Sequence, residues 1–322
     1  MKSESASFWK KLKKPIFVIA PMANVTDVAF RAMFAKYGKP DVMWTEFVSA
    51  DGLCSPGRKI LLHDLEFSKK ERPIVAQLFS AHPEKMKNAS ALVQELGFDG
   101  IDLNMGCPDR AVEKQGSGAG HIKDPDQAIK IIQAAREGAP KLPVSVKTRI
   151  GYNKVEIDTW IAKLLEQKLP ALTVHLRTRK EMSDVPAHWE LMPKIVELRD
   201  KISPETLIIG NGDVESLEDA RKKIKESCCD GVMVGRGIFG NPWFFSGKAA
   251  TPRERLEVML EHAKTFDKLL GGIKNFAIMK KHFKAYVNGW EGAKELRIKL
   301  METTTFKDVS SVVKEYLIHG KI

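Results

Sequence analysis

Short apolar runs recur along the first 235 residues, and segments with apolar residues at helical spacing separate most of them. Eight runs are predicted as strands: 16–20, 42–47, 74–79, 100–105, 144–148, 171–176, 206–210 and 231–234. Helices are predicted over 27–37, with Thr26 as its cap, and over 83–96, 125–136, 156–167 and 216–225. This alternation predicts an α/β fold, a parallel (β/α)8 TIM barrel.

An open doubly wound sheet is the alternative architecture. It would place a GxGxxG motif after the first strand, and residues 20–23 (Ala-Pro-Met-Ala) contain none. Near residue 249 the pattern changes to helices alone, predicted over 253–270, 278–288, 292–301 and 306–316. We therefore expect a catalytic barrel over residues 1–248 and a small four-helix domain over residues 249–322.

Charge separates the two parts of the chain. The protein carries a net charge of +11, and from residue 251 onward 14 Lys and Arg stand against 9 Asp and Glu in 72 residues. The helical domain is thus the more basic part per residue, which is where a nucleic acid is expected to bind. A solvated helical tail would show the same composition.

The stretch from Gly100 to Pro108 combines a strand with sulfur chemistry. Ile101, Leu103 and Met105 alternate with polar residues, which predicts a half-buried strand. Gly106 and Pro108 end that strand, so Cys107 is expected at its exposed C-terminal end. A buried structural thiol is the simpler interpretation. We favour a catalytic one, because catalytic residues of such barrels lie at the C-terminal strand ends.

Glycine-rich loops follow the last two predicted strands, where barrels often bind phosphate. Residues 210–213 read Gly-Asn-Gly-Asp and residues 235–237 read Gly-Arg-Gly. Glycines let backbone amides approach a phosphate, and the guanidinium of Arg236 can bind it through two parallel hydrogen bonds. The two loops together predict a phosphate-bearing cofactor or substrate.

Polar residues also lie in or near the ends of the other strands. Gln77 lies within the third predicted strand, Asn104 and Lys147 lie near the ends of the fourth and fifth, and His175, followed by Arg177, lies near the end of the sixth. We expect Gln77, Asn104, Lys147 and His175 to converge at one mouth of the barrel. A lone buried His or Gln is commonly a satisfied core residue, but an ammonium within an apolar strand needs a partner. Amides for a ring edge and a cation near N1 suit a flavin.

These motifs resemble the tRNA-dihydrouridine synthases of the bacterial type over nearly the whole chain. The matching stretches are 20–22, 45–46, 76–79, 102–108, 146–149, 175–178, 211–213, 235–237 and 240–243, with 281–282, Tyr286, Gly289 and 296–297 in the helical part. The run Asn-Met-Gly-Cys-Pro over 104–108 is the most specific of them. The resemblance implies reduction of the uridine C5–C6 double bond in tRNA, with FMN as cofactor and NADPH as reductant.

The resemblance also implies roles for individual residues. Hydride would pass from flavin N5 to C6, and Cys107 would protonate C5; a free thiol with a pKa of about 8.5 is mostly protonated near neutral pH. Residues implied to bind the cofactor are Pro21, Met22, Ala23, Gln77, Asn104, Lys147, His175, Asn211, Asp213, Gly235 and Arg236. Residues implied to contact substrate or RNA are Arg149, Arg177, Lys280, Lys281, Lys284 and Arg297. The chain departs from the family pattern at Leu176, in the loop 180–189 and over 118–121, which are expected to face the substrate.

Two other functions fit part of the pattern. A flavin reductase or dehydrogenase of free pyrimidines would share the flavin residues but does not need a basic helical domain. A non-catalytic RNA-binding barrel would not need Cys107, Lys147 and Arg236.

Composition excludes several other classes. The four cysteines form no CxxC or Cys/His cluster, so neither a disulfide framework nor a metal site is predicted. The apolar run after Lys13 and Lys14 covers only residues 16–20, too short for a signal peptide or a membrane span. We expect a cytoplasmic monomer that does not bind membranes.

Overall fold

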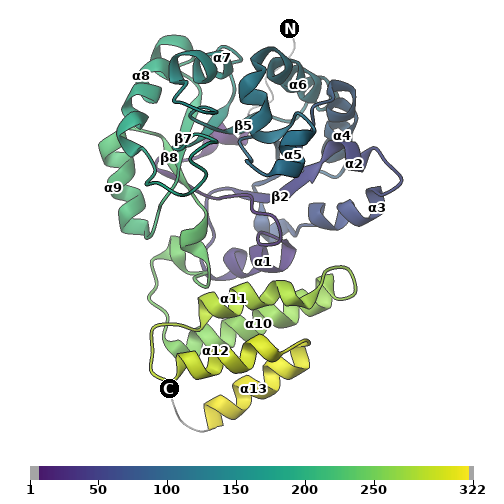
Figure 1. Cartoon of the computed structure of the whole chain (residues 1–322), viewed down its shortest axis with the longest axis vertical. Coiled ribbons are helices and arrows are strands. Elements are labelled where there is room, and N and C mark those ends of the chain that lie inside the picture. Colours follow the sequence, from purple (N-terminus) through teal and green to yellow (C-terminus); the bar gives the residue numbers. More distant parts are fainter. Residues whose placement is uncertain (1–6, 319–322) are drawn as a thin grey trace.

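The computed structural model describes residues 7–318 as a β/α barrel with a group of helices packed beneath it (Figure 1). The eight strands are β1 Ile16–Ile19, β2 Met43–Ser49, β3 Ile74–Phe79, β4 Gly100–Met105, β5 Val144–Arg149, β6 Ala171–His175, β7 Leu207–Asn211 and β8 Gly231–Val234. They pair in parallel in the order β1-β8-β7-β6-β5-β4-β3-β2. A parallel bridge between Val18 and Val42 joins the two ends of this sheet. The predicted (β/α)8 barrel is confirmed, and the open doubly wound sheet is excluded.

Helices follow most strands and cover the outside of the barrel. The longer ones are α1 Val28–Tyr37, α4 Pro83–Glu95, α6 Pro125–Gly138, α8 Met192–Ile202 and α9 Leu217–Ser227. Shorter pieces are α2 Ala50–Leu53, α3 Arg58–Leu61, α5 Arg110–Lys114 and α7 Ala162–Leu165. Helix α8 had not been predicted. The predicted helix 156–167 is divided into a π-helical turn, Ile157–Ile161, and α7.

The N-terminal cap of α1 differs from the prediction. Asp27 caps the helix, because its carboxylate accepts a hydrogen bond from the backbone N–H of Phe30 at 2.9 Å. The hydroxyl of Thr26 instead accepts a hydrogen bond from the backbone N–H of Met22, at 2.9 Å. Thr26 therefore shapes the turn before the helix rather than capping the helix.

The barrel has two separate apolar cores. One lies between the sheet and its helices and includes Ile101, Leu103 and Met105. The other fills the barrel interior, where Trp9 and Trp44 lie 5.8 Å apart between ring centroids. All six residues of β4 are buried. The half-buried strand predicted there is wrong, because the polar face of β4 points into the barrel rather than to solvent.

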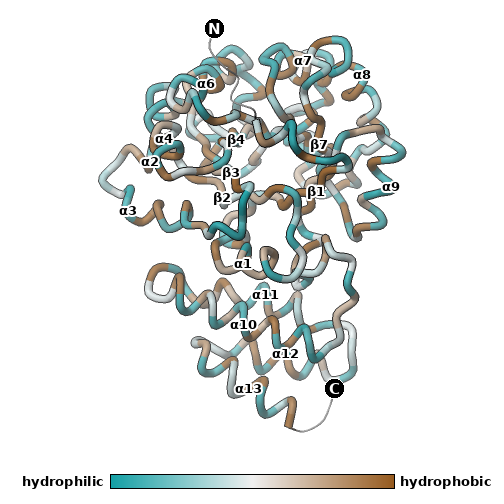
Figure 2. The backbone as a smooth tube through the Cα atoms, turned by 180° about the vertical axis from the view of Figure 1, so that it is seen from behind, coloured by the Kyte–Doolittle hydropathy of each residue, from teal (hydrophilic) through white to brown (hydrophobic). Residues whose placement is uncertain are grey.

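The C-terminal region consists of α10 Pro252–Leu270, α11 Met279–Tyr286, α12 Ala293–Glu302 and α13 Phe306–Ile318. Their apolar faces share a core with Val28, Ala29 and Met33 of α1, so these helices dock on the first helix of the barrel (Figures 1 and 2). The boundary predicted at residues 248 and 249 lies just before α10 and stays a prediction.

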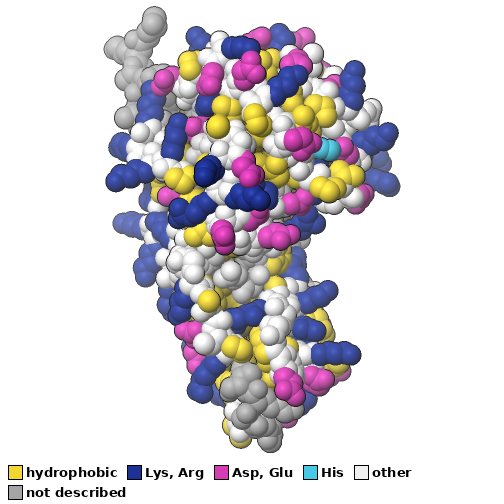
Figure 3. Space-filling model, turned by 90° about the vertical axis from the view of Figure 1, so that its left-hand side faces the viewer, with side chains coloured by type: hydrophobic (Ala, Val, Ile, Leu, Met, Phe, Trp, Pro, Cys, Tyr) yellow, Lys and Arg dark blue, Asp and Glu magenta, His cyan; other side chains and the backbone are white. Residues whose placement is uncertain are grey.

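The surface carries charges of both signs. Figure 3 shows Lys and Arg side chains on the barrel and on the helical region, with Asp and Glu among them. Among the helices of residues 7–318, none combines the length and the apolar character needed to cross a membrane.

Candidate active site

A cavity of about 660 Å³ lies at the C-terminal ends of the strands, between β1 and β5–β8. Eight residues predicted to bind the cofactor line it: Pro21, Met22, Lys147, His175, Asn211, Asp213, Gly235 and Arg236. Arg177, predicted to contact the substrate, lines it as well. Ala23, Gln77 and Asn104 lie outside this lining, and so does Cys107, the predicted catalytic residue. The loops after β1, β7 and β8 form most of its wall.

Strand register explains how residues far apart in sequence meet at this cavity. Asn104 of β4 is opposite Lys147 of β5. Two residues further along the strands, Arg149 is opposite His175, and His175 is opposite Asn211 of β7. Because side chains alternate between the faces of a strand, all of these point to the barrel interior. Two successive layers of polar side chains therefore cover the apolar filling of the barrel.

Asp213 organises the basic groups of the cavity. Its carboxylate accepts hydrogen bonds from Arg177 and from Arg236, the second at 3.0 Å. Burial would raise the pKa of Asp213, but the hydrogen bonds from Arg177 and from the N–H of Ala187 lower it below its ordinary value. The Arg177 side chain is almost fully buried, whereas 69% of the Arg236 side chain is exposed. Arg236 is thus the arginine that can turn towards an incoming anion.

Close packing requires glycine at two places beside the cavity. A Cβ atom at Gly210 would come within 2.5 Å of the Trp189 ring. The indole N–H of Trp189 donates a hydrogen bond to the carbonyl of Gly212 at 2.8 Å. At Gly237 a Cβ atom would lie 2.1 Å from the carbonyl oxygen of Val214. The two glycine-rich loops are therefore fixed by their neighbours rather than merely flexible.

Lys147 supplies a cation at the cavity floor. Burial, together with the nearby charge of Arg149, lowers the pKa of its ammonium to about 8. No hydrogen bond of this ammonium is found within residues 7–318. Attraction to the Asp102 carboxylate raises this pKa, and a value of about 8 leaves the ammonium mostly charged at neutral pH.

His175 is a neutral donor beside this cation. Its pKa lies well below the ordinary value because of burial and because of the charges of Lys147 and three arginines. Arg177 lies 3.1 Å from Nε2 of His175 and can only donate, so the ring proton belongs on Nδ1. His175 can therefore donate one hydrogen bond from Nδ1.

Gln77 and Asp102 form a deeper polar layer. The Gln77 amide donates to the Asp102 carboxylate at 2.6 Å, and the Ser145 hydroxyl donates to the same carboxylate at 2.6 Å. Burial raises the pKa of Asp102 to about 6, although these two hydrogen bonds lower it. The side-chain oxygen of Gln77 has no hydrogen-bond partner in the part of the chain that the structure describes. Gln77 therefore keeps one buried acceptor, although it does not line the cavity.

Cys107 lies just beyond the end of β4 and is held through its backbone. The side-chain oxygen of Asn104 accepts hydrogen bonds from the N–H of Gly106 at 3.2 Å and of Cys107 at 3.0 Å. The carbonyl of Cys107 accepts a hydrogen bond from the N–H of Ala119 at 2.9 Å. Burial raises the pKa of the thiol above its ordinary value. The thiol is therefore protonated at neutral pH and can act as an acid.

A glycine of the following loop packs against this cysteine. Gly118 has φ +59°, and a Cβ atom there would lie 2.7 Å from the carbonyl oxygen of Cys107. His121, three residues later, is buried and lies 3.1 Å from the carbonyl of Ser80. The segment 118–121, which departs from the family pattern, therefore packs against Cys107.

The dihydrouridine synthase (Dus) family model matches residues 18–319 of the chain. The chain belongs to the dihydrouridine synthase family. A relative from Staphylococcus aureus (strain COL), named "Probable tRNA-dihydrouridine synthase", is 42% identical over 315 residues, which are 96% of this chain and 95% of the relative. One from Bacillus subtilis (strain 168), named "Probable tRNA-dihydrouridine synthase 2", is 41% identical over 315 residues, 96% of each chain.

Solved structures agree on the fold. The old yellow enzyme homologue from Zymomonas mobilis has a TM-score of 0.51 at 13% identity, over 73% of this chain and 89% of its own. Histamine dehydrogenase from Rhizobium sp. 4-9 has a TM-score of 0.50 at 11% identity, over 77% of this chain and 48% of its own. At these identities the likeness concerns the barrel alone.

Within this member of the dihydrouridine synthase family, the residues predicted to contact RNA fall into two groups. Arg149 and Arg177 are buried at the barrel mouth. Arg149 donates to the backbone carbonyls of Gly106, Thr178 and Met182, at 2.8–2.9 Å. These hydrogen bonds connect the loop that contains Cys107 to the loop after β6. Contact between Arg149 and the substrate stays a prediction.

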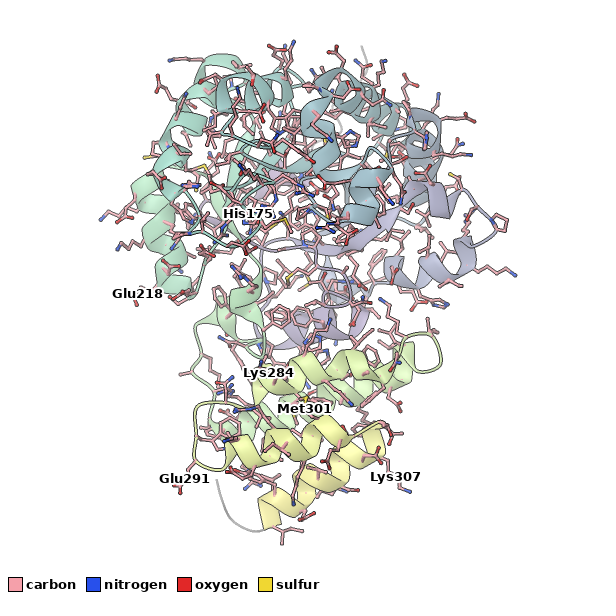
Figure 4. All side chains as sticks on the ribbon, viewed as in Figure 1. His175, Glu218, Lys284, Glu291, Met301 and Lys307 are labelled. Atoms are coloured by element: carbon pink, nitrogen blue, oxygen red, sulfur yellow. The ribbon has the colours of Figure 1, made fainter. Side chains whose placement is uncertain are left out.

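The second group lies on the helical region. Lys280, Lys281 and Lys284 lie on α11, and Figure 4 shows Lys284 on the side of this region next to the barrel. Arg297 of α12 donates to the carbonyl of Val287 at 2.8 Å. Lys281 donates to the carbonyl of Asn24 at 2.9 Å, a contact with the barrel that sequence reasoning missed.

Sequence reasoning also missed cavity residues of the synthase. Ser183, Glu215 and Met233 line the cavity. Met233 is opposite Asn211 in the pairing of β7 with β8, so strand register gives a signal for it. Ser183 and Glu215 lie in loops, where no periodic pattern marks them.

A second cavity, of about 750 Å³, lies at the opposite end of the barrel. It is lined by residues that precede β5, β6 and β7, such as Pro143, Pro170 and Glu205, together with three basic side chains, Lys10, Arg136 and Lys168. None of the predicted site residues lines it. Catalysis in this fold takes place at the C-terminal strand ends, so the smaller cavity is the candidate active site.

Proposed function

We propose that this chain is a tRNA-dihydrouridine synthase that reduces the C5–C6 double bond of uridines in tRNA, with FMN as cofactor and NADPH as reductant. The observation that carries the proposal is the pairing of β4 with β5: β5 carries a cationic lysine, Lys147, and the end of β4 leads directly to a protonated thiol, Cys107. Family membership and the two relatives named as tRNA-dihydrouridine synthases support it.

The cavity residues fit a phosphate-bearing flavin. Arg236 is largely exposed and Gly235 and Gly237 flank it, so this loop can hold the phosphate. Lys147 offers a charge without a hydrogen-bond partner in the described chain, and His175 offers one N–H. Asn211, Pro21 and Met22 would complete the wall. When bound, FMN supplies the hydride that uridine C6 accepts.

The chain's own part in the reaction is the proton. Reduction of the double bond adds a hydride at C6 and a proton at C5, and a thiol held protonated by burial is a suitable source of that proton. The backbone N–H of Cys107 donates to the Asn104 side chain and its carbonyl accepts from the N–H of Ala119, so the backbone is held at both ends of this residue. Cys107 is therefore proposed as the general acid.

RNA recognition would involve the mouth and the helical region together. A uridine in folded tRNA must leave its stack to reach a barrel mouth, which costs a few kcal/mol. Lys284 lies on the side of the helical region next to the barrel (Figure 4), and Lys281 contacts the barrel at Asn24, so lysines of α11 can bind phosphates while the base is displaced. All of these residues are on one chain, so we expect a monomer to be active.

The test is reaction of the purified protein with an unmodified tRNA transcript, FMN and NADPH without oxygen. We expect dihydrouridine in the tRNA, detected by mass spectrometry of its nucleosides, and none in a parallel reaction with free uracil. Reduction of free uracil but not of tRNA would assign the chain to the pyrimidine reductases. A protein that binds tRNA and retains no flavin would indicate a non-catalytic barrel. Replacing NADPH with NADH tests the reductant.

A further inference from the structure

The loop between β1 and α1 connects the cavity to the C-terminal helices. Pro21 and Met22 of this loop line the cavity, and two residues later Asn24 is attached on both sides. The N–H of Asn24 donates a hydrogen bond to Glu46, and its carbonyl accepts one from Lys281 of α11 at 2.9 Å. Asn24 has φ +55°, a left-handed conformation that a non-glycine residue adopts at some cost. These outside contacts help to hold that conformation.

Glu46 is itself held by the helical region. Lys274, which follows the end of α10, contacts the Glu46 carboxylate and lies 2.7 Å from a carboxylate oxygen of Asp64. Only 13% of the Lys274 side chain and 5% of the Glu46 side chain are exposed. Burial would lower the pKa of Lys274, but Glu46 and Asp64 raise it, so the ammonium stays charged. Removal of one partner would leave a buried charge unpaired, which is strongly unfavourable.

The β1–α1 loop is a compact turn, so the contacts that hold Asn24 also restrain the residues of this loop that line the cavity. The N–H of Met22 donates to the Thr26 hydroxyl at 2.9 Å, and its carbonyl accepts hydrogen bonds from the N–H groups of Val25 and Thr26. Met22 and Asn24 thus belong to the same turn. A displacement of Asn24 would therefore move Met22, whose sulfur would lie 3.8 Å from a Cβ atom at Gly235 in the neighbouring loop after β8.

We propose that Lys274 and Lys281 are positioning residues, through which the C-terminal helices hold the β1–α1 loop against the cofactor cavity. This role is separate from RNA binding, although Lys281 is also a predicted RNA contact. The helical region thereby contributes to cofactor retention even when no RNA is bound. The proposal rests on the proposed function only in taking FMN as the ligand of the cavity.

The test compares Lys274→Met and Lys281→Met with two matched controls. Lys268→Met removes an exposed lysine of α10 for which no hydrogen bond or ion pair is found within residues 7–318, and Lys299→Met breaks an exposed ion pair with Glu315 inside the helical region. Hydrogen exchange of the amides of residues 21–27 is measured in the cofactor-free protein, and FMN affinity is measured by fluorescence titration. We expect faster exchange and a roughly three- to tenfold weaker FMN affinity in the first two variants only.

The outcomes separate this inference from the proposed function. If the unaltered protein does not bind FMN, the cofactor assignment fails, and the exchange measurement still decides whether the lysines hold the loop. Unchanged exchange and unchanged FMN affinity in folded Lys274→Met and Lys281→Met proteins would overturn the inference. If Lys274→Met does not fold, Glu46→Gln takes its place, because it keeps an acceptor for Asn24 and removes only the charge paired with Lys274. The Glu46→Gln protein is then expected to show the same faster exchange, and unchanged exchange would overturn the inference.

Discussion

The side-chain oxygen of Asn104 accepts a hydrogen bond from the backbone N–H of Cys107 at 3.0 Å. Asn104 therefore positions the residue that ends the polar face of β4. Its neighbour across the sheet, Lys147, lies close enough to Cys107 to lower the pKa of the thiol, against the larger effect of burial. The acid and the cation of the proposed reaction are thus placed by one pair of adjacent strands.

Replacement of Cys107 by Ala separates a general acid from a structural thiol. We expect the variant to fold, bind FMN and accept electrons from NADPH, because the Asn104 and Ala119 hydrogen bonds involve only the backbone at this position. Reoxidation of the reduced flavin by tRNA should be slower by ~10²–10⁴-fold, the usual contribution of a general acid. Flavin absorbance after anaerobic mixing with unmodified tRNA measures this rate. Rapid reoxidation together with lower stability would indicate a packing role.

Replacement of Arg236 by Ala tests the phosphate site. The arginine is exposed and pairs with Asp213, which Arg177 still neutralises in the variant, so the fold should persist. Loss of a charge-assisted contact with phosphate should weaken FMN retention by roughly tenfold or more. Flavin content after dilution and gel filtration is the measurement. Arg253→Ala, which removes an exposed arginine of α10, is the control. Full flavin occupancy in Arg236→Ala would move the phosphate elsewhere.

Charge reversal at Lys280 and Lys284 tests the RNA surface. The double Lys→Glu variant should bind tRNA more weakly, and its affinity should depend less steeply on salt, because phosphate contacts release counterions. Filter binding at several salt concentrations gives both quantities. Lys201→Glu, on the outer barrel helix α8, should leave them unchanged. An unaltered salt slope in the double variant would place the RNA on the barrel rim.

Lys147 should make the stability of the cofactor-free protein depend on pH in alkaline solution. Its folded pKa of about 8 lies below the ordinary 10.5, so between these values the unfolded chain holds the proton and the folded chain does not. The contribution of Lys147 to the free energy of unfolding therefore rises by up to about 1.4 kcal/mol per pH unit in that window. Urea unfolding of the protein and of Lys147→Met at pH 7.5 to 9.5 isolates this contribution. Parallel pH profiles would contradict the assigned pKa.

A buried histidine pair should make the protein sensitive to acid. His262 and His282 lie 4.9 Å apart between ring centroids, and their ring nitrogens have no hydrogen-bond partner within residues 7–318. Burial lowers the pKa of His262 to about 3, so below pH 6.5 the unfolded chain binds a proton that the folded chain does not. Stability from this residue is lost as the pH falls through that window. The free energy of unfolding, measured with urea, should fall less between pH 7 and pH 5 in His262→Leu than in the unaltered protein. An equal fall in both would contradict the assigned pKa of His262.

The sequence was informative wherever periodicity and chain order determine position. Strand alternation predicted that Gln77, Asn104, Lys147 and His175 would converge at one mouth. Lys147 and His175 do line one cavity, because neighbouring parallel strands bring their C-terminal ends together, whereas Gln77 and Asn104 lie outside its lining. Side-chain hydrogen bonds were not predictable in this way. Arg149 was interpreted as a substrate contact, yet its N–H groups bond backbone carbonyls of loops whose course no pattern in the sequence describes.

Long-range contacts were the least predictable. Lys281 and Asn24 are 257 residues apart, and only the docking of α11 beside the barrel brings them together. Ala23 was expected to bind the cofactor with its two neighbours; it is exposed and does not line the cavity, and its contact with the cofactor stays a prediction. Local chemistry at Thr26 and Asp27 was ambiguous, since either side chain can cap a helix.

The packed interior of the barrel determines the direction from which reactants arrive. Trp9, Trp44 and their apolar neighbours occupy the barrel interior beneath the polar layers, so residues 7–318 leave no passage through the barrel from its other end. In the proposed reaction, a nicotinamide and a uridine would both reach the cofactor from the side of the C-terminal strand ends. The oxidised nicotinamide would then leave before the RNA base enters. Reductant and RNA would therefore bind in alternation at one site, with the cofactor holding the electrons in between.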